Sequence, residues 1–191
     1  MNSSNSPSGG ALTTGLVLAL FATMRISAEV NSVEIEGIPN FSQWQGAPSF
    51  AGQPVGFGGQ PEPAAMAELA KRGFGTIITL RLPDEDNANI DALRSAAEGA
   101  GLHYLNLPFH PEKSPPGTID SIISTMSEDA NRPVFIHCNT ATRAAVVWMA
   151  GRVQRDGLAP GVAKREGELI AEKPDLAVKF LDAWLDTAVS E

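Results

Sequence analysis

Three short runs of apolar and β-branched residues alternate with amphipathic stretches through the middle of the chain, and this alternation restricts the possible folds more than any other feature. The runs at residues 74–82, 102–109 and 132–138 are typical of buried strands. The stretches at 88–101 and 118–130 have the apolar spacing of helices. Strands and helices that alternate at this distance favour a parallel sheet with right-handed crossovers. We therefore predict an α/β fold with a mostly parallel central sheet flanked by helices.

The flanking stretches predict further helices and a single domain. Apolar spacing and terminal signals indicate helices at 62–73 and 142–157, and two more within 160–191 that are separated by a proline. Residues 29–49 show little periodicity, and we interpret them as a lead-in segment that packs onto a domain formed by 50–191. A hydrophobic fraction of 43% in 191 residues is enough for one core.

The chain is acidic, with a formal net charge of −8. A protein of this charge repels the phosphates of nucleic acids and of anionic lipids. We therefore expect no nucleic-acid partner, and no membrane partner beyond the process of export. Any anionic ligand must be bound by a local group of cations and N–H donors.

Residues 1–28 differ in composition from the rest and predict a secretory signal peptide. A polar opening is followed by the apolar run ALTTGLVLALFATM and by Ala28, a small residue that suits cleavage before Glu29. The run is short for a bilayer span, and Arg25 follows it where a signal peptide carries its positive charge in front. We expect export to the periplasm or the exterior, with a disordered extension or a single anchor as the alternative.

Functional groups of a parallel sheet collect at the edge where strands end and helices begin. Three loops of the predicted fold, at 83–89, 108–117 and 138–143, lie along one such edge. The third loop holds the only cysteine of the chain, Cys138, and ends at Arg143 where a helix starts. This edge is the predicted site.

Cys138 and Arg143 form a pair suited to attack on a tetrahedral anion. The N–H groups at a helix start bind anions and stabilise a thiolate, and the planar arginine fork can hold two oxygens of a phosphate or sulfate. One loop then supplies a nucleophile, an oxyanion cradle and a charge clamp. The alternative is that Cys138 is a small buried hydrophobic residue at a strand end.

Metals and cofactors are not expected. The histidines, His103, His110 and His137, are widely spaced and accompany a single cysteine, which is not a zinc pattern. The glycine-rich stretch GFGGQP lacks the lysine and the spacing of a nucleotide-binding loop.

The stretches GGQP, FGTIITLRLPDED, GLHYLNLPF and HCNTATRAAVVWMAG resemble the bacterial beta-lactamase-hydrolase-like (DUF442) family, whose phosphatase-like fold is related to dual-specificity protein tyrosine phosphatases. The resemblance implies a cysteine-phosphatase fold that hydrolyses phosphate monoesters through a phosphocysteine on Cys138, with Arg143 as the phosphate clamp. It also implies that His137 orients the loop and tunes the thiolate. The substrate, a phosphorylated or other oxyanionic compound, would bind the loop residues Asn139, Thr140, Ala141 and Thr142.

The loop also departs from tyrosine phosphatases, and the departures leave other functions open. Four residues separate Cys138 from Arg143, which is the spacing of rhodanese-type sulfurtransferases that carry a persulfide on cysteine. Ala141 stands where the family has glycine, and Ala144 stands where phosphatases have Ser or Thr. A sulfurtransferase with a Cys138 persulfide and a catalytically inactive module that binds anions or phosphoproteins are therefore the alternatives.

Cleavage of a phosphate monoester benefits from a proton donor for the leaving oxygen. In the related phosphatases an aspartate on a neighbouring loop supplies the proton, but the matching loop here has Glu112 and no aspartate. Asp84 and Asp86 lie at the same predicted edge, and Asp84 is our candidate catalytic acid. All three acids are also typical of solvated turns and surface loops.

Overall fold

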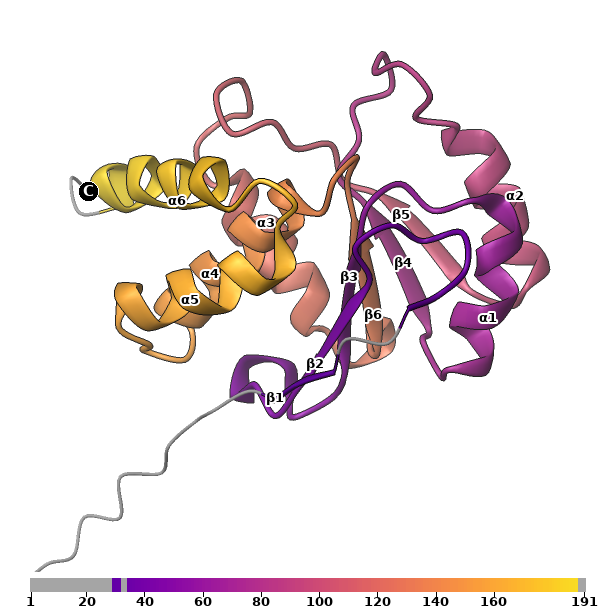
Figure 1. The fold of residues 1–191 in the computed structure, drawn as a ribbon, viewed down its shortest axis with the longest axis horizontal. Coiled ribbons are helices and arrows are strands. Elements are labelled where there is room, and N and C mark those ends of the chain that lie inside the picture. The colour runs from indigo at the N-terminus through magenta and orange to yellow at the C-terminus, as the bar shows by residue number, and fades with distance from the viewer. Residues whose placement is uncertain (1–28, 32–33, 189–191) are drawn as a thin grey trace, which may run out of the picture.

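The centre of the computed structural model, which describes residues 29–31 and 34–188, is a six-stranded sheet in the order β1-β2-β3-β6-β4-β5 (Figure 1). Strands β3, β6, β4 and β5 run parallel, whereas β1 and β2 join the sheet in antiparallel pairing. The predicted α/β class with a mostly parallel sheet is therefore confirmed. The strands are β1 (Glu29–Asn31), β2 (Ser42–Gln45), β3 (Val55–Gly58), β4 (Thr76–Thr79), β5 (His103–Asn106) and β6 (Val134–His137).

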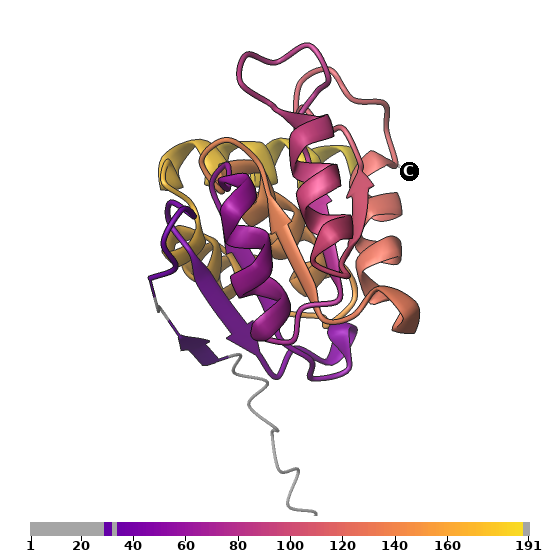
Figure 2. The same cartoon turned by 90° about the vertical axis from the view of Figure 1, so that its right-hand side faces the viewer.

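Helices cover both faces of the sheet. One layer holds α1 and α2, which lie in front of the sheet in Figure 2, and the other layer holds α3 to α6. The predicted separation of the last two helices at a proline is confirmed, because α5 ends at Ile170 and α6 begins at Pro174. The helices are α1 (Met66–Lys71), α2 (Ile90–Gly99), α3 (Thr118–Ser127), α4 (Thr142–Gln154), α5 (Pro160–Ile170) and α6 (Pro174–Ala188), with short 3-10 turns at Pro48–Phe50, Pro63–Ala65 and Asp129–Asn131.

Helix α4 forms the centre of the larger hydrophobic core. Every residue from 144 to 150 is buried, which explains why this helix is apolar nearly all round in sequence. Trp148 stacks on Phe50 at 5.4 Å between ring centroids and meets Phe57 edge to face at 5.2 Å. Because α4 is enclosed by the sheet and by α3, α5 and α6, its first turn is held rigidly at the edge of β6.

Three strands were not predicted from the sequence. Strand β3 contains two glycines, a composition that weakens a strand signal, yet it lies in the middle of the sheet. A Cβ atom on Gly56 would lie 2.7 Å from the Phe74 ring, and one on Gly58 would lie 2.6 Å from Ile38. The glycines are needed because neighbouring side chains pack directly on this backbone. Residues 29–49, interpreted as a lead-in, contribute β1 and β2 to the same sheet.

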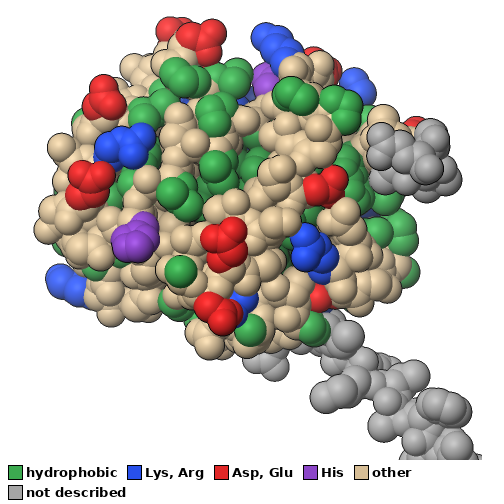
Figure 3. Space-filling view, turned by 180° about the vertical axis from the view of Figure 1, so that it is seen from behind, with side chains coloured by type: hydrophobic (Ala, Val, Ile, Leu, Met, Phe, Trp, Pro, Cys, Tyr) green, Lys and Arg blue, Asp and Glu red, His purple; other side chains and the backbone are tan. Residues whose placement is uncertain are grey.

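The predicted signal peptide at 1–28 lies outside the described residues, and export stays a prediction. Within the part of the chain that the structure describes, no helix combines the length and the apolar character needed to cross a membrane. On the described part of the face shown in Figure 3, Asp and Glu side chains are interspersed with Lys and Arg, so this face has no extended basic surface of the kind that binds nucleic acid.

Candidate active site

The loop between β6 and α4 lies at the bottom of a pocket of about 450 Å³. Cys138 is only 1% exposed, but it lines the pocket together with Asn139, Thr140, Thr142 and Arg143. Its sulfur therefore lies at the base of an open pocket. The prediction that the 83–89, 108–117 and 138–143 loops meet at one edge agrees with the lining, which includes Asp84, Glu85, His110 and Pro111 from the first two loops.

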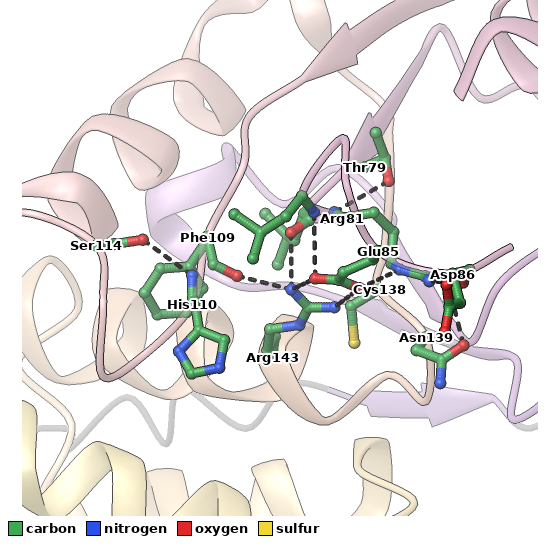
Figure 4. Close-up of polar contacts among 12 residues, drawn as sticks. Thr79, Arg81, Glu85, Asp86, Phe109, His110, Ser114, Cys138, Asn139 and Arg143 are labelled. Atoms are coloured by element: carbon green, nitrogen blue, oxygen red, sulfur yellow. Dashed lines mark hydrogen bonds and ion pairs between the residues drawn. The ribbon is translucent and has the colours of Figure 1, made fainter. Parts of the chain in front are cut away.

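Arg143 projects from the first turn of α4 toward the Cys138 sulfur and is held there by other groups (Figure 4). Its Nη1 donates hydrogen bonds to the carbonyl oxygens of Leu80 at 3.1 Å and Phe109 at 2.9 Å. Burial lowers the pKa of this guanidinium, but interactions with Glu85 and Cys138 raise the pKa by more than burial lowers it, so the net shift is upward. The arginine is a fixed positive charge beside the sulfur.

Glu85 is the principal site residue that the sequence analysis did not select. Its Oε1 and Oε2 accept hydrogen bonds from Nη1 and Nη2 of Arg143, at 2.6 and 2.8 Å. Burial opposes ionisation of this carboxyl, but hydrogen bonds from Arg143, the Leu82 N–H and Arg81 outweigh it and lower its pKa to about 2. The Nε–H and the second Nη2–H of Arg143 make no hydrogen bond to an oxygen of a described residue. Arg143 also makes a side-chain hydrogen bond to Cys138, so its remaining donors lie where an anion next to the sulfur can accept from them.

Arg81 has a structural role beside the site. It is 2% exposed and forms an ion pair with Glu85. Its Nη2 donates to the carbonyl oxygen of Asp86 at 2.6 Å, so it fixes the 83–89 loop. Asp86 thus helps to fix the loop through its backbone carbonyl, and its side chain does not line the pocket.

The GGQP stretch supports the cysteine loop from β3. The Gln60 N–H donates to the carbonyl oxygen of Asn139 at 3.0 Å, and Gln60 Oε1 accepts from Arg81 Nη1 at 2.7 Å. A Cβ atom on Gly59 would lie 2.9 Å from the Asn139 carbonyl oxygen. Glycine is therefore required at position 59 because the two backbones approach closely.

Ala141 adopts a backbone conformation that favours glycine. It is the N-cap of α4, with φ +58° and ψ −10°, and it is fully buried. The left-handed conformation costs an L-residue about 1–2 kcal/mol. Ala141 does not line the pocket, so its side chain is not placed to contact a ligand there, and its role in substrate binding stays a prediction. An alanine in this conformation strains the turn.

His137 lies on the other side of the loop from the pocket. It is fully buried, stacks on Phe135 and has Nδ1 3.3 Å from the carbonyl oxygen of Cys138. Burial, together with the charges of Arg81 and Arg143, lowers its pKa to about 3, although the Cys138 carbonyl opposes the shift. His137 is neutral at physiological pH and supports the loop structurally, and it offers no positive charge to the thiolate.

The segment between α5 and α6 supports the loop from the opposite side. The Glu172 N–H donates to the carbonyl oxygen of Thr140 at 3.2 Å, and the Lys173 N–H donates to Thr142 Oγ1 at 3.3 Å. The hydroxyls of Thr140 and Thr142 lie 3.1 Å apart. Both threonines are therefore fixed at the pocket wall, close to the cysteine loop.

The structure separates the three candidate acids. Asp84 lines the pocket, whereas Asp86 and Glu112 do not. His110 also lines it, and its Nδ1 accepts the Glu112 N–H at 3.2 Å. Among the described residues, no group of three or more His, Cys, Asp or Glu side chains is placed to hold a metal ion.

Comparison with known proteins identifies the family. The family described as "Beta-lactamase hydrolase-like protein, phosphatase-like domain" matches residues 49–155. The chain belongs to this family. The resemblance inferred from the sequence motifs is thus confirmed, and the matched region runs from β3 through α4 and includes Cys138, Arg143 and Glu85.

Curated relatives are longer proteins. A beta-lactamase hydrolase-like protein of Agrobacterium fabrum is 29% identical over 140 residues, which are 67% of this chain and 32% of the relative. Its namesake in Xylella fastidiosa is 31% identical over 106 residues, which are 51% of this chain and 24% of the relative. The chain thus spans about a quarter to a third of the length of these relatives.

Solved structures of phosphatases share the fold. TpbA of P. aeruginosa superimposes with a TM-score of 0.59 at 19% identity, covering 86% of this chain and 91% of TpbA. A TpbA variant has been solved in complex with phosphotyrosine, with a TM-score of 0.55 at 17% identity and coverage of 84% and 89%. The core catalytic domain of the PP-IP phosphatase SIW14 of S. cerevisiae, in complex with citrate, gives 0.61 at 17% identity, with coverage of 82% and 92%. The predicted cysteine-phosphatase fold is confirmed.

Proposed function

We propose that this chain is a cysteine-dependent phosphatase that hydrolyses phosphate monoesters. The observation that carries the proposal is the placement of the Cys138 sulfur beside the Arg143 guanidinium at the first turn of α4, at the base of a pocket. A helix N-terminus and a guanidinium both stabilise a thiolate and a bound oxyanion. Membership of a phosphatase-like family, and the phosphotyrosine bound by TpbA, support this reading.

The first chemical step is attack by the Cys138 thiolate on phosphorus. The S–P bond forms as the bond between phosphorus and the leaving oxygen breaks, and Arg143 Nε–H and Nη2–H bind the equatorial phosphate oxygens. The leaving oxygen takes a proton from the Asp84 carboxyl, the one acid among the three sequence candidates that lines the pocket.

The second step hydrolyses the phosphocysteine. Water attacks phosphorus, the S–P bond breaks, and the Asp84 carboxylate takes the proton that the water loses. Inorganic phosphate leaves and the thiolate is restored. Ala144 supplies no hydroxyl to the departing sulfur, and the hydroxyls nearest the loop are those of Thr140 and Thr142.

A sulfurtransferase is the second candidate, and the loop length favours it. Four residues lie between Cys138 and Arg143, so the ring that receives the substrate anion has fewer inward N–H groups than the longer ring of tyrosine phosphatases. In this reaction Cys138 takes a sulfur atom from thiosulfate, releases sulfite, and passes the sulfur to cyanide as thiocyanate. No proton donor for a leaving oxygen is needed.

Aryl phosphates of graded leaving-group basicity test the first proposal. Wild-type protein should hydrolyse p-nitrophenyl phosphate and phenyl phosphate, and Cys138→Ser should hydrolyse neither. Asp84→Asn should lose more activity toward phenyl phosphate, because the more basic leaving oxygen depends more on a proton donor. Asp86→Asn, which changes an acid outside the pocket, is the matched control.

A parallel assay with thiosulfate and cyanide tests the second candidate. Thiocyanate produced by the wild type and not by Cys138→Ser, with no aryl phosphate hydrolysis, would establish the sulfurtransferase in place of the phosphatase. If neither assay shows Cys138-dependent turnover while inorganic phosphate binds, the chain is an anion-binding module, and the catalytic proposal is overturned.

A further inference from the structure

Two lysines line the mouth of the Cys138 pocket in addition to Arg143. Lys113 comes from the loop before α3, and Lys173 comes from the segment between α5 and α6. Both are exposed, and neither forms an ion pair with a described residue. They therefore bring two positive charges from different parts of the sequence to one pocket.

Backbone hydrogen bonds tie both lysines to the site. The Lys113 N–H donates to the carbonyl oxygen of His110 at 3.1 Å, in the turn that also lines the pocket. The Lys173 N–H donates to Thr142 Oγ1 at 3.3 Å, directly on the cysteine loop. The starting points of both side chains are thus fixed relative to Cys138.

The acids next to these lysines in sequence lie elsewhere. Glu172 Oε2 accepts a hydrogen bond from Asn40 Nδ2 at 2.7 Å, and it does not line the pocket. Glu112 lines the neighbouring groove between the 109–118 loop and α6. The charges of Lys113 and Lys173 are therefore not neutralised by the carboxylates that flank them.

The charge balance of the pocket favours an anion larger than one phosphate. Arg143 and Arg81 both contact Glu85, so these three groups carry one net positive charge at the base, which the Cys138 thiolate of the proposed mechanism balances. At the mouth, Asp84 opposes Lys113 and Lys173, and an excess of positive charge remains. This local excess exists in a chain of net charge −8, so the general field of the protein does not produce it.

We propose that the substrate carries a second anionic group, a phosphate or a carboxylate, next to the phosphate that reacts. The reacting phosphate binds the Cys138 loop and Arg143, and the second group binds between Lys113 and Lys173 at the mouth of the pocket. This inference rests on the proposed function for the identity of the reacting group, but the binding of a double anion can be measured without turnover.

Calorimetry on the full chain carrying Cys138→Ser compares inorganic phosphate with pyrophosphate at constant ionic strength. Pyrophosphate should bind at least about fivefold more tightly, the effect of roughly 1 kcal/mol from exposed ion pairs. Both lysines are replaced together because exposed ion pairs contribute little individually. In the Lys113→Gln, Lys173→Gln double variant, the affinity for pyrophosphate should be within about twofold of the affinity for inorganic phosphate. Lys179→Gln is the matched control, because Lys179 lines the neighbouring groove and not this pocket.

Equal affinities for the two anions would overturn the inference. So would a pyrophosphate preference that survives in the double variant, or one that Lys179→Gln removes equally well. A Lys-dependent preference without hydrolysis of any phosphate ester by the wild type would retain the double-anion site and overturn the proposed phosphatase function. Circular dichroism and thermal unfolding of each variant confirm that the fold is retained.

Discussion

Glu85 and Arg143 are joined by two hydrogen bonds of 2.6 and 2.8 Å across 58 positions of sequence. The carboxylate occupies one edge of the guanidinium, and the edge formed by Nε and Nη2 is left for a ligand. An arginine held in this way needs little reorganisation when an anion binds. We infer that Glu85 positions the clamp and does not itself react.

Replacement of Glu85 by glutamine should lower both the catalytic efficiency and the stability of the protein. We expect kcat/KM for p-nitrophenyl phosphate to fall about 10- to 100-fold because Arg143 is misplaced. The free energy of unfolding should fall by about 1.5–3 kcal/mol, the range for hydrogen bonds to charged groups. Glu112→Gln, at an exposed position outside the pocket, is the control. Equal effects of the two substitutions would contradict the positioning role.

Acid should remove the Glu85 contribution to stability. Its pKa in the folded protein is lowered to about 2 from an ordinary 4.5, so the folded state stays ionised where the unfolded chain takes up a proton. The stabilisation is complete above pH 4.5 and is lost as the pH falls toward about 2. Urea unfolding of the wild type and Glu85→Gln should show a stability difference that shrinks over this window. A difference that is constant with pH would argue against the ion pair.

Ala141→Gly should relieve the strain at the N-cap of α4. Ala141 has φ +58°, and glycine adopts this conformation without the steric cost, although the buried methyl group is lost. The strain relief of about 1–2 kcal/mol is partly offset by the greater entropy of glycine in the unfolded chain, so the net expectation is a gain of less than about 1 kcal/mol in the free energy of unfolding. Ala144→Gly, inside the same helix, should instead destabilise by about 1 kcal/mol or more. Thermal unfolding distinguishes the two, and destabilisation by both would show that the turn is not strained.

Gly59→Ala should displace the cysteine loop. The added Cβ atom would lie 2.9 Å from the Asn139 carbonyl oxygen, closer than real Cβ contacts allow. We expect kcat/KM to fall by about 10-fold or more, since small displacements of a reacting group are costly. Gly99→Ala, at a position where the Cβ meets nothing within 4 Å, should leave activity unchanged. Wild-type activity in Gly59→Ala would show that the contact with β3 does not position the nucleophile.

The sequence was sufficient to predict those strands whose own residues form an apolar run. Strands β4 and β6 are buried on both faces, so each appears as an apolar, β-branched run. Strand β5 lies at the edge of the sheet and is only partly buried, but it lies within the largely apolar stretch LHYLNLPF. Strand β3 is equally buried but contains Gly56 and Gly58, and its stability comes from Phe74, Phe135 and Ile38 packing on it. Such contacts between distant residues leave no periodic pattern, and for this reason β3 was missed.

Site residues were likewise predicted where their partners are close in sequence and missed where only the fold brings the partners together. Cys138 and Arg143 are close in sequence, so their spacing at a strand–helix junction predicts their partnership. Glu85 lies in a turn with two other acids, Asp84 and Asp86, and only the fold selects it by bringing Arg143 to it. One local signal existed, because Glu85 lies four positions after Arg81, with which it also pairs. Lys173 lies beyond the family match and was recognised only from the pocket.

The most direct test of the account is the mass of Cys138 during turnover. Protein mixed with an aryl phosphate, quenched rapidly in acid and digested, should yield a Cys138 peptide that carries one phosphoryl group. That adduct should be absent from Cys138→Ser and should disappear when the substrate is exhausted. Steady hydrolysis by the wild type with no phosphoryl group on Cys138, or with the group on another residue, would contradict the proposed mechanism.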